Sequence, residues 1–118
     1  MNHAWLRPLL VPCLLSIASV GCGKPTAASV CAHVASATAA LPSKAAACGG
    51  YVEASGGACE PRLAACSEAD LASIDRQATC LDKLGTCAKG SETAWYDSVV
   101  ACSSTVGTLS AACVNGSK

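Results

Sequence analysis

The chain has 118 residues with eight basic and eight acidic side chains, so its formal net charge at pH 7 is zero. This balance provides no basic surface for a phosphate backbone, which excludes nucleic acid as an expected partner. Alanine dominates the apolar residues and phenylalanine is absent. Because a buried alanine contributes far less than the roughly 1.5–3 kcal/mol of a buried leucine, the core needs additional support.

The first 21 residues have the features of a secretory signal peptide. A single basic residue, Arg7, precedes an apolar run from Leu9 to Val20, and this run leads to Cys22 through a small residue. The run is about a dozen residues long, whereas about 20 are needed to cross a bilayer. Residues 1–21 are therefore expected to direct export and then to be removed.

The sequence SVGC at positions 19–22 resembles the bacterial lipobox, in which a small residue precedes a lipidated cysteine. The resemblance implies that Cys22 becomes the first mature residue and carries a thioether-linked diacylglycerol and an amide-linked acyl chain such as palmitate. Two or more such chains give stable membrane anchoring. Gly23 stands where inner-membrane lipoproteins usually have aspartate, which favours the outer membrane. The alternative is an unlipidated, secreted protein that is cut at the same bond.

Eight cysteines follow Cys22. Removal of residues 1–21 leaves 97 residues, enough for one domain with a modest core. An even number of cysteines in a small exported domain predicts four disulfides. We therefore expect a signal peptide at 1–21, a lipidated N-terminus with a short tether at 22–28, and a cysteine-rich helical domain at 29–118. The predicted disulfide residues are Cys31, Cys48, Cys59, Cys66, Cys80, Cys87, Cys102 and Cys113.

Two helices are predicted in the first half of the mature chain. Apolar residues recur at steps of four, three and four from Val30 to Leu41, which predicts a helix over 26–41. The same spacing continues over 43–56. Glycine pairs at 49–50 and 56–57 each disfavour a helix by up to about 1 kcal/mol per residue, so this second helix is expected to be frayed or broken.

Two further helices are predicted in the second half, after a turn or single helical loop at 60–66. Ser67 with Asp70 approximates a capping box, and an apolar stripe then predicts a helix over 67–84. Gly85 is placed just past the end of this helix, which leaves Cys87 in a loop. From Trp95 to Cys113, apolar residues and cysteines recur at steps of four, three, four, three and four, which predicts one helix over 92–112.

The predicted fold is all-α, a small disulfide-stapled bundle of about four helices. Short connections favour antiparallel neighbours. If the third and fourth helices are antiparallel, Cys66 and Cys113 lie at the same far end, and Cys80 and Cys102 lie nearer the connecting loop. Among the 105 possible connectivities of eight cysteines, this register favours Cys66–Cys113 and Cys80–Cys102.

The residue patterns contain no recognisable catalytic, metal or cofactor site. His33 follows Cys31 by two residues, but such positions point apart on a helix, so we expect a polar surface histidine and a disulfide-bonded cysteine. Asp75 and Asp82 are expected to form part of a solvated helix face. The chain has no C-x-x-C pair, no phosphate-binding loop and no G-x-S-x-G motif, which argues against metal binding, cofactors and enzymatic activity.

Two neighbouring aromatic residues differ in their expected environment. Trp95 lies on the apolar stripe of the last predicted helix and is expected in the core. Tyr96 lies one position further round the helix. We therefore expect Tyr96 to be exposed and to be a possible surface contact for a partner.

Over nearly its whole length the chain resembles the small, alanine-rich and cysteine-rich lipoproteins of myxobacteria, most of which have no assigned function. The resemblance rests on the SVGC sequence at 19–22 and on the eight spaced cysteines. It implies an anchored envelope protein and carries over no catalytic or binding residue. Plant lipid-transfer proteins and fungal hydrophobins also have eight cysteines, but they contain adjacent Cys-Cys pairs that are absent from this chain.

These observations predict a non-enzymatic cell-envelope protein. The lipid on Cys22 would bind the membrane, and the helical domain would serve interaction with an unknown envelope or extracellular protein, or structure. An alternative is a carrier of a small apolar ligand, held in a cavity that small residues leave among the helices. The same small residues also allow the helices to pack closely.

Overall fold

The computed structural model describes residues 23–50 and 57–116, and this part of the chain is helical with no strand. The predicted signal peptide and Cys22 lie outside the described residues. An all-α fold is therefore confirmed, although the helices are shorter and more numerous than predicted. They are α1 (Ala27–Ala39), α2 (Leu41–Lys44), the 3-10 helix η1 (Ala46–Cys48), α3 (Cys59–Leu63), α4 (Glu68–Lys83), α5 (Glu92–Ser104) and α6 (Ala111–Gly116).

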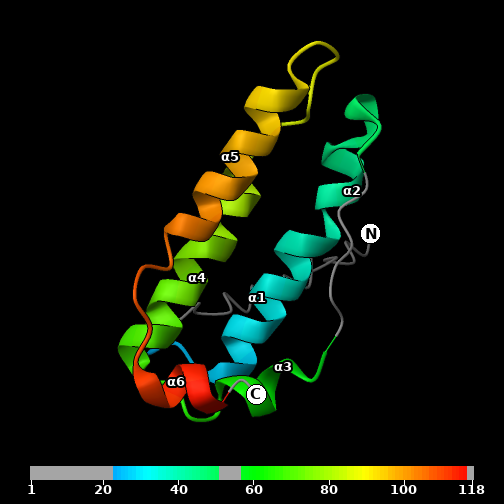
Figure 1. The fold of residues 1–118 in the computed structure, drawn as a ribbon. Coiled ribbons are helices and arrows are strands. Elements are labelled where there is room, and N and C mark those ends of the chain that lie inside the picture. The colour runs from blue at the N-terminus through cyan, green and yellow to red at the C-terminus, as the bar shows by residue number, and fades with distance from the viewer. Residues whose placement is uncertain (1–22, 51–56, 117–118) are drawn as a thin grey trace, which may run out of the picture.

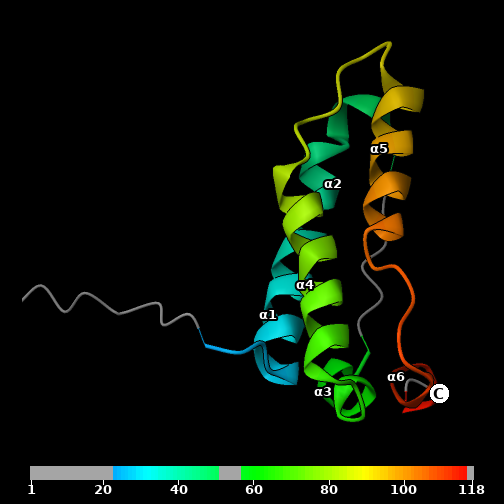
Figure 2. The ribbon, with the colours of Figure 1, turned by 90° about the vertical axis from the view of Figure 1, so that its left-hand side faces the viewer.

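Three longer helices form the body of the molecule. α1 and α4 lie side by side and run in the same direction, and α5 returns antiparallel along α4 (Figure 1). The beginnings of α1 and α4 gather with α3 and α6 at one end, which is the lower end in Figures 1 and 2. We call this the α3–α6 end. The loop at 84–91 and the end of α2 lie at the opposite end.

Local side-chain contacts explain where α1 and α4 begin. Thr26 and Ser29 form a reciprocal capping box at the start of α1, where each side chain accepts a hydrogen bond from the other residue's backbone N–H at 3.0–3.1 Å. This start shortens the tether expected at 22–28, because the helix begins at Ala27. At α4, Ser67 and Asp70 form the predicted capping box.

The predicted helix over 43–56 is wrong for the residues that the structure describes. Helix α2 ends at Lys44, and η1 adds only a short 3-10 turn to Cys48. Gly49 follows with φ of +64°, a left-handed conformation that ends the helical run. Residues 51–56 lie outside the described part of the chain.

The single helix predicted over 92–112 is also wrong. Helix α5 ends at Ser104, Gly107 has φ of +67°, and the chain becomes helical again only at Ala111. The apolar periodicity of the sequence therefore continues across a backbone break. The spacing still matches the core beyond the break, because α6 directs Cys113 into the interior, where this residue is fully buried.

The core is small and lies between α1, α2, α4 and α5. Among the described residues, Trp95 is the aromatic residue that is at least nine-tenths buried, as its place on the stripe predicts, and its indole Nε1 donates a hydrogen bond of 2.8 Å to the Gly85 carbonyl. Most of the other buried side chains are alanine, leucine or cysteine. The core cluster comprises Ala37, Leu41, Ala45, Ala78, Leu81, Cys87, Trp95 and Cys102.

All eight cysteines from Cys31 to Cys113 form disulfides. The pairs Cys66–Cys113 and Cys80–Cys102 match those predicted from the antiparallel register of the last helices. The other two are Cys31–Cys59, between α1 and α3, and Cys48–Cys87, between η1 and the loop after α4. In the chain-entropy model, each closure of this length stabilises the fold by about 3–4.5 kcal/mol, although the contributions do not simply add.

The left-handed backbone at Gly107 provides a test of the break between α5 and α6. Replacing Gly107 with alanine should lower the free energy of unfolding by about 1–2 kcal/mol, because a Cβ atom disfavours this conformation. Denaturant unfolding with the disulfides intact measures the effect. Gly85→Ala is the matched control, since Gly85 has a negative-φ backbone and no atom within 4 Å of the added Cβ. Equal stability of the two variants would contradict the break.

Candidate functional site

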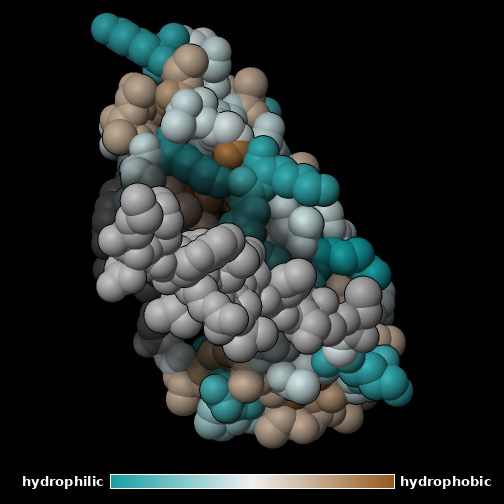
Figure 3. Space-filling view, turned by 180° about the vertical axis from the view of Figure 1, so that it is seen from behind, coloured by the Kyte–Doolittle hydropathy of each residue, from teal (hydrophilic) through white to brown (hydrophobic). Residues whose placement is uncertain are grey.

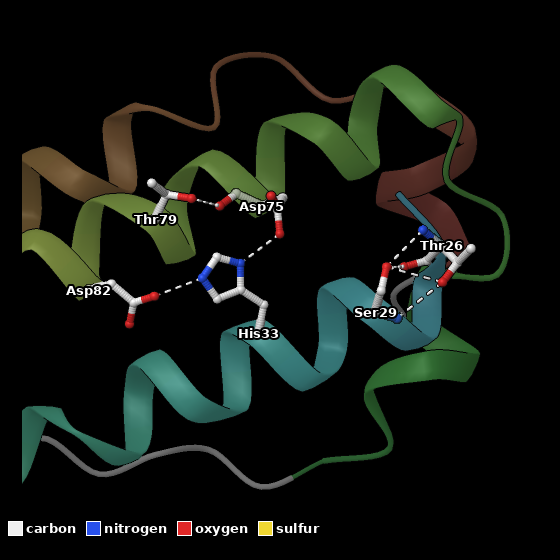
Figure 4. A network of polar contacts seen from close by, with 6 residues as sticks. All are labelled: Thr26, Ser29, His33, Asp75, Thr79 and Asp82. Carbon is white, nitrogen blue, oxygen red and sulfur yellow. Dashed lines mark hydrogen bonds and ion pairs between the residues drawn. The ribbon is translucent and has the colours of Figure 1, made fainter. Parts of the chain in front are cut away.

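A histidine held between two carboxylates links the two parallel helices. His33 of α1 places Nδ1 2.7 Å from Asp75 Oδ1 and Nε2 2.8 Å from Asp82 Oδ2 of α4 (Figure 4). Asp75 and Asp82 are seven residues apart, which puts them two helical turns apart on one face. We call these three residues the histidine bridge.

The histidine bridge favours the charged form of the imidazole. Both ring nitrogens can donate only when the ring is protonated, and each then meets a carboxylate oxygen. The hydrogen bonds to Asp75 and then Asp82 raise the pKa of His33 above its ordinary value. The three side chains remain 30–47 % exposed, so water screens their attraction and limits its contribution to stability.

This arrangement leaves no Cys–His pair for nucleophilic chemistry. Cys31 Sγ is bonded to Cys59, and both nitrogens of His33 are engaged by Asp75 and Asp82. Asp75 and Asp82 lie on a partly exposed face of α4, in agreement with the prediction of a solvated face, but both also contact His33, which was not predicted. Their spacing of seven residues was the available signal, but the sequence did not show that α1 packs beside α4.

A lysine at the opposite end of α4 satisfies the last carbonyl groups of that helix. Lys44 Nζ donates hydrogen bonds of 2.9 Å to the carbonyl oxygens of Leu81 and Asp82. The Lys44 carbonyl in turn accepts a hydrogen bond of 2.7 Å from the backbone N–H of Cys87. A cation at a helix C-terminus is electrostatically favourable. Together with the Cys48–Cys87 disulfide, these bonds join α2 to the end of α4.

A buried carboxylate connects the start of α4 to the start of α6. Asp70 is only 5 % exposed, and its side chain accepts hydrogen bonds from the backbone N–H and hydroxyl groups of both Ser67 and Ser110 at 2.6–2.9 Å. We call these three residues the Asp70 cluster. Its hydrogen bonds, those from Ser110 first and those from Ser67 next, hold the pKa of Asp70 well below its usual range.

The Asp70 cluster explains why α6 forms where it does. Ser110 Oγ accepts a hydrogen bond of 3.3 Å from the Cys113 backbone N–H, which is a capping contact for a helix that begins at Ala111. The Cys66–Cys113 disulfide lies beside this contact in the chain. Sequence reasoning identified Asp70 as a cap of α4, but it missed the contact with Ser110, which is 40 residues away.

Tyr96 is not the freely exposed residue that the sequence suggests. It is half-buried and packs against the core, with its ring edge-on to that of Trp95 at a centroid separation of 5.2 Å. Its hydroxyl lies so close to Gly50 that any side chain at Gly50 would overlap it. Tyr96 therefore holds the 49–50 turn against α5, and this limits its surface for a partner.

The described residues show neither a metal-binding arrangement nor a membrane span. Within 23–50 and 57–116, no three His, Cys, Asp or Glu side chains are arranged to hold a metal ion. The helices in the same ranges lack the length and apolar character that crossing a bilayer requires. Comparisons of the chain with protein-family models, with curated proteins and with solved structures found no match.

The histidine bridge predicts that stability depends on pH. Because the folded-state pKa of His33 is raised, the bridge stabilises the fold fully below about pH 6.5, the unfolded-state pKa, and loses this contribution as pH rises through the folded-state value. Thermal unfolding of the mature chain should therefore show a melting temperature that falls over this window. In the His33→Gln variant the dependence should disappear.

Proton NMR tests the same prediction directly, since His33 is the sole histidine after residue 21. Its ring signals should titrate above the ordinary histidine value, and Asp75→Asn or Asp82→Asn should lower the midpoint. A midpoint at the ordinary value in the unmodified chain would contradict the bridge.

Proposed function

We propose that this chain is a lipid-anchored protein of the bacterial cell envelope, whose disulfide-bonded helical domain acts by binding other envelope or extracellular proteins. The observation that carries the proposal is the SVGC sequence at 19–22, which follows an apolar export segment. Acylation of Cys22 would anchor the chain stably, because two or more acyl chains hold a protein at a membrane. Gly23 favours the outer membrane as the destination.

The disulfides support export. Bonds of this kind form and persist in oxidising compartments, such as the bacterial periplasm and the cell surface, and are rare in the cytosol of most organisms. All eight cysteines after residue 22 are paired. A reducing compartment would remove these crosslinks from a domain whose core consists mainly of small side chains.

The polar contacts support a binding role over catalysis. The carboxylates and the imidazole of the histidine bridge satisfy one another, and the Asp70 carboxylate is satisfied by two serines, so both sets of contacts join helices. Such contacts hold the backbone in one arrangement, which is what a rigid binding module requires. The partner in this proposal is a protein of the envelope or of the medium.

The fate of Cys22 tests the proposal. The protein purified from its own envelope should have a mass that corresponds to a chain starting at Cys22 with added acyl groups, and it should partition into detergent. Cys22→Ala should abolish both properties. Cys13→Ala is the matched control and should change neither, because Cys13 lies within the removed segment and follows Pro12, where a lipobox requires a small residue.

Two outcomes would count against the anchor. A mature chain that starts at Cys22 without acyl mass would favour the secreted alternative. Retention of acyl mass by the Cys22→Ala variant would show that another residue is modified. In either case the envelope assignment would need a different basis.

A further inference from the structure

We propose that the α3–α6 end of the domain lies on the lipid bilayer to which Cys22 is anchored, so that the loop at 84–91 points away from the membrane. This inference rests on the proposed acylation of Cys22. It goes beyond that proposal because it assigns the face of the domain that meets the membrane and the end that is presented to a partner. Three observations carry it: the length of the tether, the side chains at this end, and the direction of the long helices.

The tether between Cys22 and the first helix is very short. Only residues 23–26 separate Cys22 from the start of α1 at Ala27. Even fully extended, this segment spans no more than about 18 Å. Lys24 forms an ion pair of 3.0 Å with Glu68 at the start of α4, and Thr26 is fixed in the α1 capping box. The anchor therefore leaves the domain at the α3–α6 end.

The side chains exposed at the α3–α6 end suit contact with a bilayer surface. Val114 is 49 % exposed, one of two large apolar residues that are prominently exposed in the described part of the chain. α6 packs on α3 closely enough that a Cβ at Gly116 would lie 2.8 Å from that of Ala65. Their exposed surfaces therefore adjoin. The exposed apolar residues of this surface are Ala64, Ala65, Ala111, Ala112 and Val114.

The charges of this surface lie on α3, where Glu60 and Arg62 are both exposed, whereas α6 carries none. No residue from 98 to 117 is charged, so all of α6 is neutral. The nearest acidic residue on α4, Glu68, is paired with Lys24. In Figure 3, tan atoms gather along the lower edge of the molecule, where teal side chains also protrude, and other long teal side chains protrude at the opposite end. Exposed Lys83 and Lys89 belong to that opposite end. The uncharged helix α6 is thus the part of this end that can approach lipid with the lower desolvation cost.

The direction of the helices sets the height of the opposite end. α4 begins at the α3–α6 end and contains 16 residues, so it extends about 24 Å. The loop at 84–91 follows it directly. With the α3–α6 end on the bilayer, this loop and the neighbouring turn at Gly49 form the part of the domain farthest from the membrane.

A matched pair of tryptophan variants tests this orientation. Val114→Trp places the probe at the α3–α6 end, and Val100→Trp places it at the other prominently exposed valine, 67 % exposed on α5. The acylated full-length mature proteins are reconstituted into phospholipid vesicles with brominated acyl chains, which quench nearby tryptophan. Unmodified protein supplies the background from Trp95. A second probe, Asn115→Trp, covers the possibility that Val114→Trp fails to fold.

After subtraction of the Trp95 background, the emission of the introduced tryptophan in Val114→Trp or Asn115→Trp should fall at least about twofold. The reason is that interfacial side chains enter the headgroup boundary by about 5–10 Å. The emission of Val100→Trp should be unchanged. If all variants float with the vesicles and the probes on α6 are not quenched, or if Val100→Trp is quenched instead, the orientation is overturned while the anchor stands. Unmodified protein that fails to float overturns the anchor itself, and with it this inference.

Discussion

The fold depends on covalent crosslinks that compensate for a weak core. Within residues 23–50 and 57–116, the buried apolar residues are mainly alanine, leucine and cysteine, with Trp95 as the large aromatic residue among them. The alanine side chains allow close packing, but each contributes little free energy on burial. Four disulfides close sequence separations of 22–47 residues and so restrict the unfolded chain strongly. Two of them, Cys31–Cys59 and Cys66–Cys113, involve residues at the α3–α6 end, and Cys48–Cys87 holds the opposite end.

Polar contacts then select one arrangement of the crosslinked helices. Lys44 bonds to the last carbonyls of α4 next to the Cys48–Cys87 disulfide, and the Asp70 cluster orders the start of α6 next to Cys66–Cys113. The histidine bridge lies between these ends and fixes the register of α1 against α4. Each contact is modest, but together they constrain rotations and shifts that disulfides alone permit. The resulting domain is suited to presenting a fixed surface.

Much of this organisation could be predicted from local patterns. The capping box at Ser67 located α4, and the antiparallel arrangement of the helices predicted over 67–84 and 92–112 favoured two of the four disulfides. Periodicity failed where the backbone changes conformation. The apolar spacing runs through Gly49 and Gly107, yet both residues adopt positive φ and interrupt the helices. A pattern of side chains does not reveal such breaks, because residues beyond them can still point into the core.

Contacts between distant segments were the other part that sequence reasoning missed. His33 meets Asp75 and Asp82 only because the chain returns after α2 and lays α4 parallel to α1, a choice that no local signal specifies. Tyr96 was expected at the surface because of its position on α5. It is instead covered in part by the turn at Gly50, which comes from another region of the sequence.

Four specific disulfides hold the domain, and this is the claim on which the rest of the structure depends most. Mass-spectrometric mapping of proteolytic fragments tests this claim, using unreduced protein from its native envelope that is alkylated after denaturation. The predicted result is no alkylated cysteine and linked fragments for Cys31–Cys59, Cys48–Cys87, Cys66–Cys113 and Cys80–Cys102. Alkylated thiols in this set, or a different pairing, would contradict the account and leave the small core without its main support.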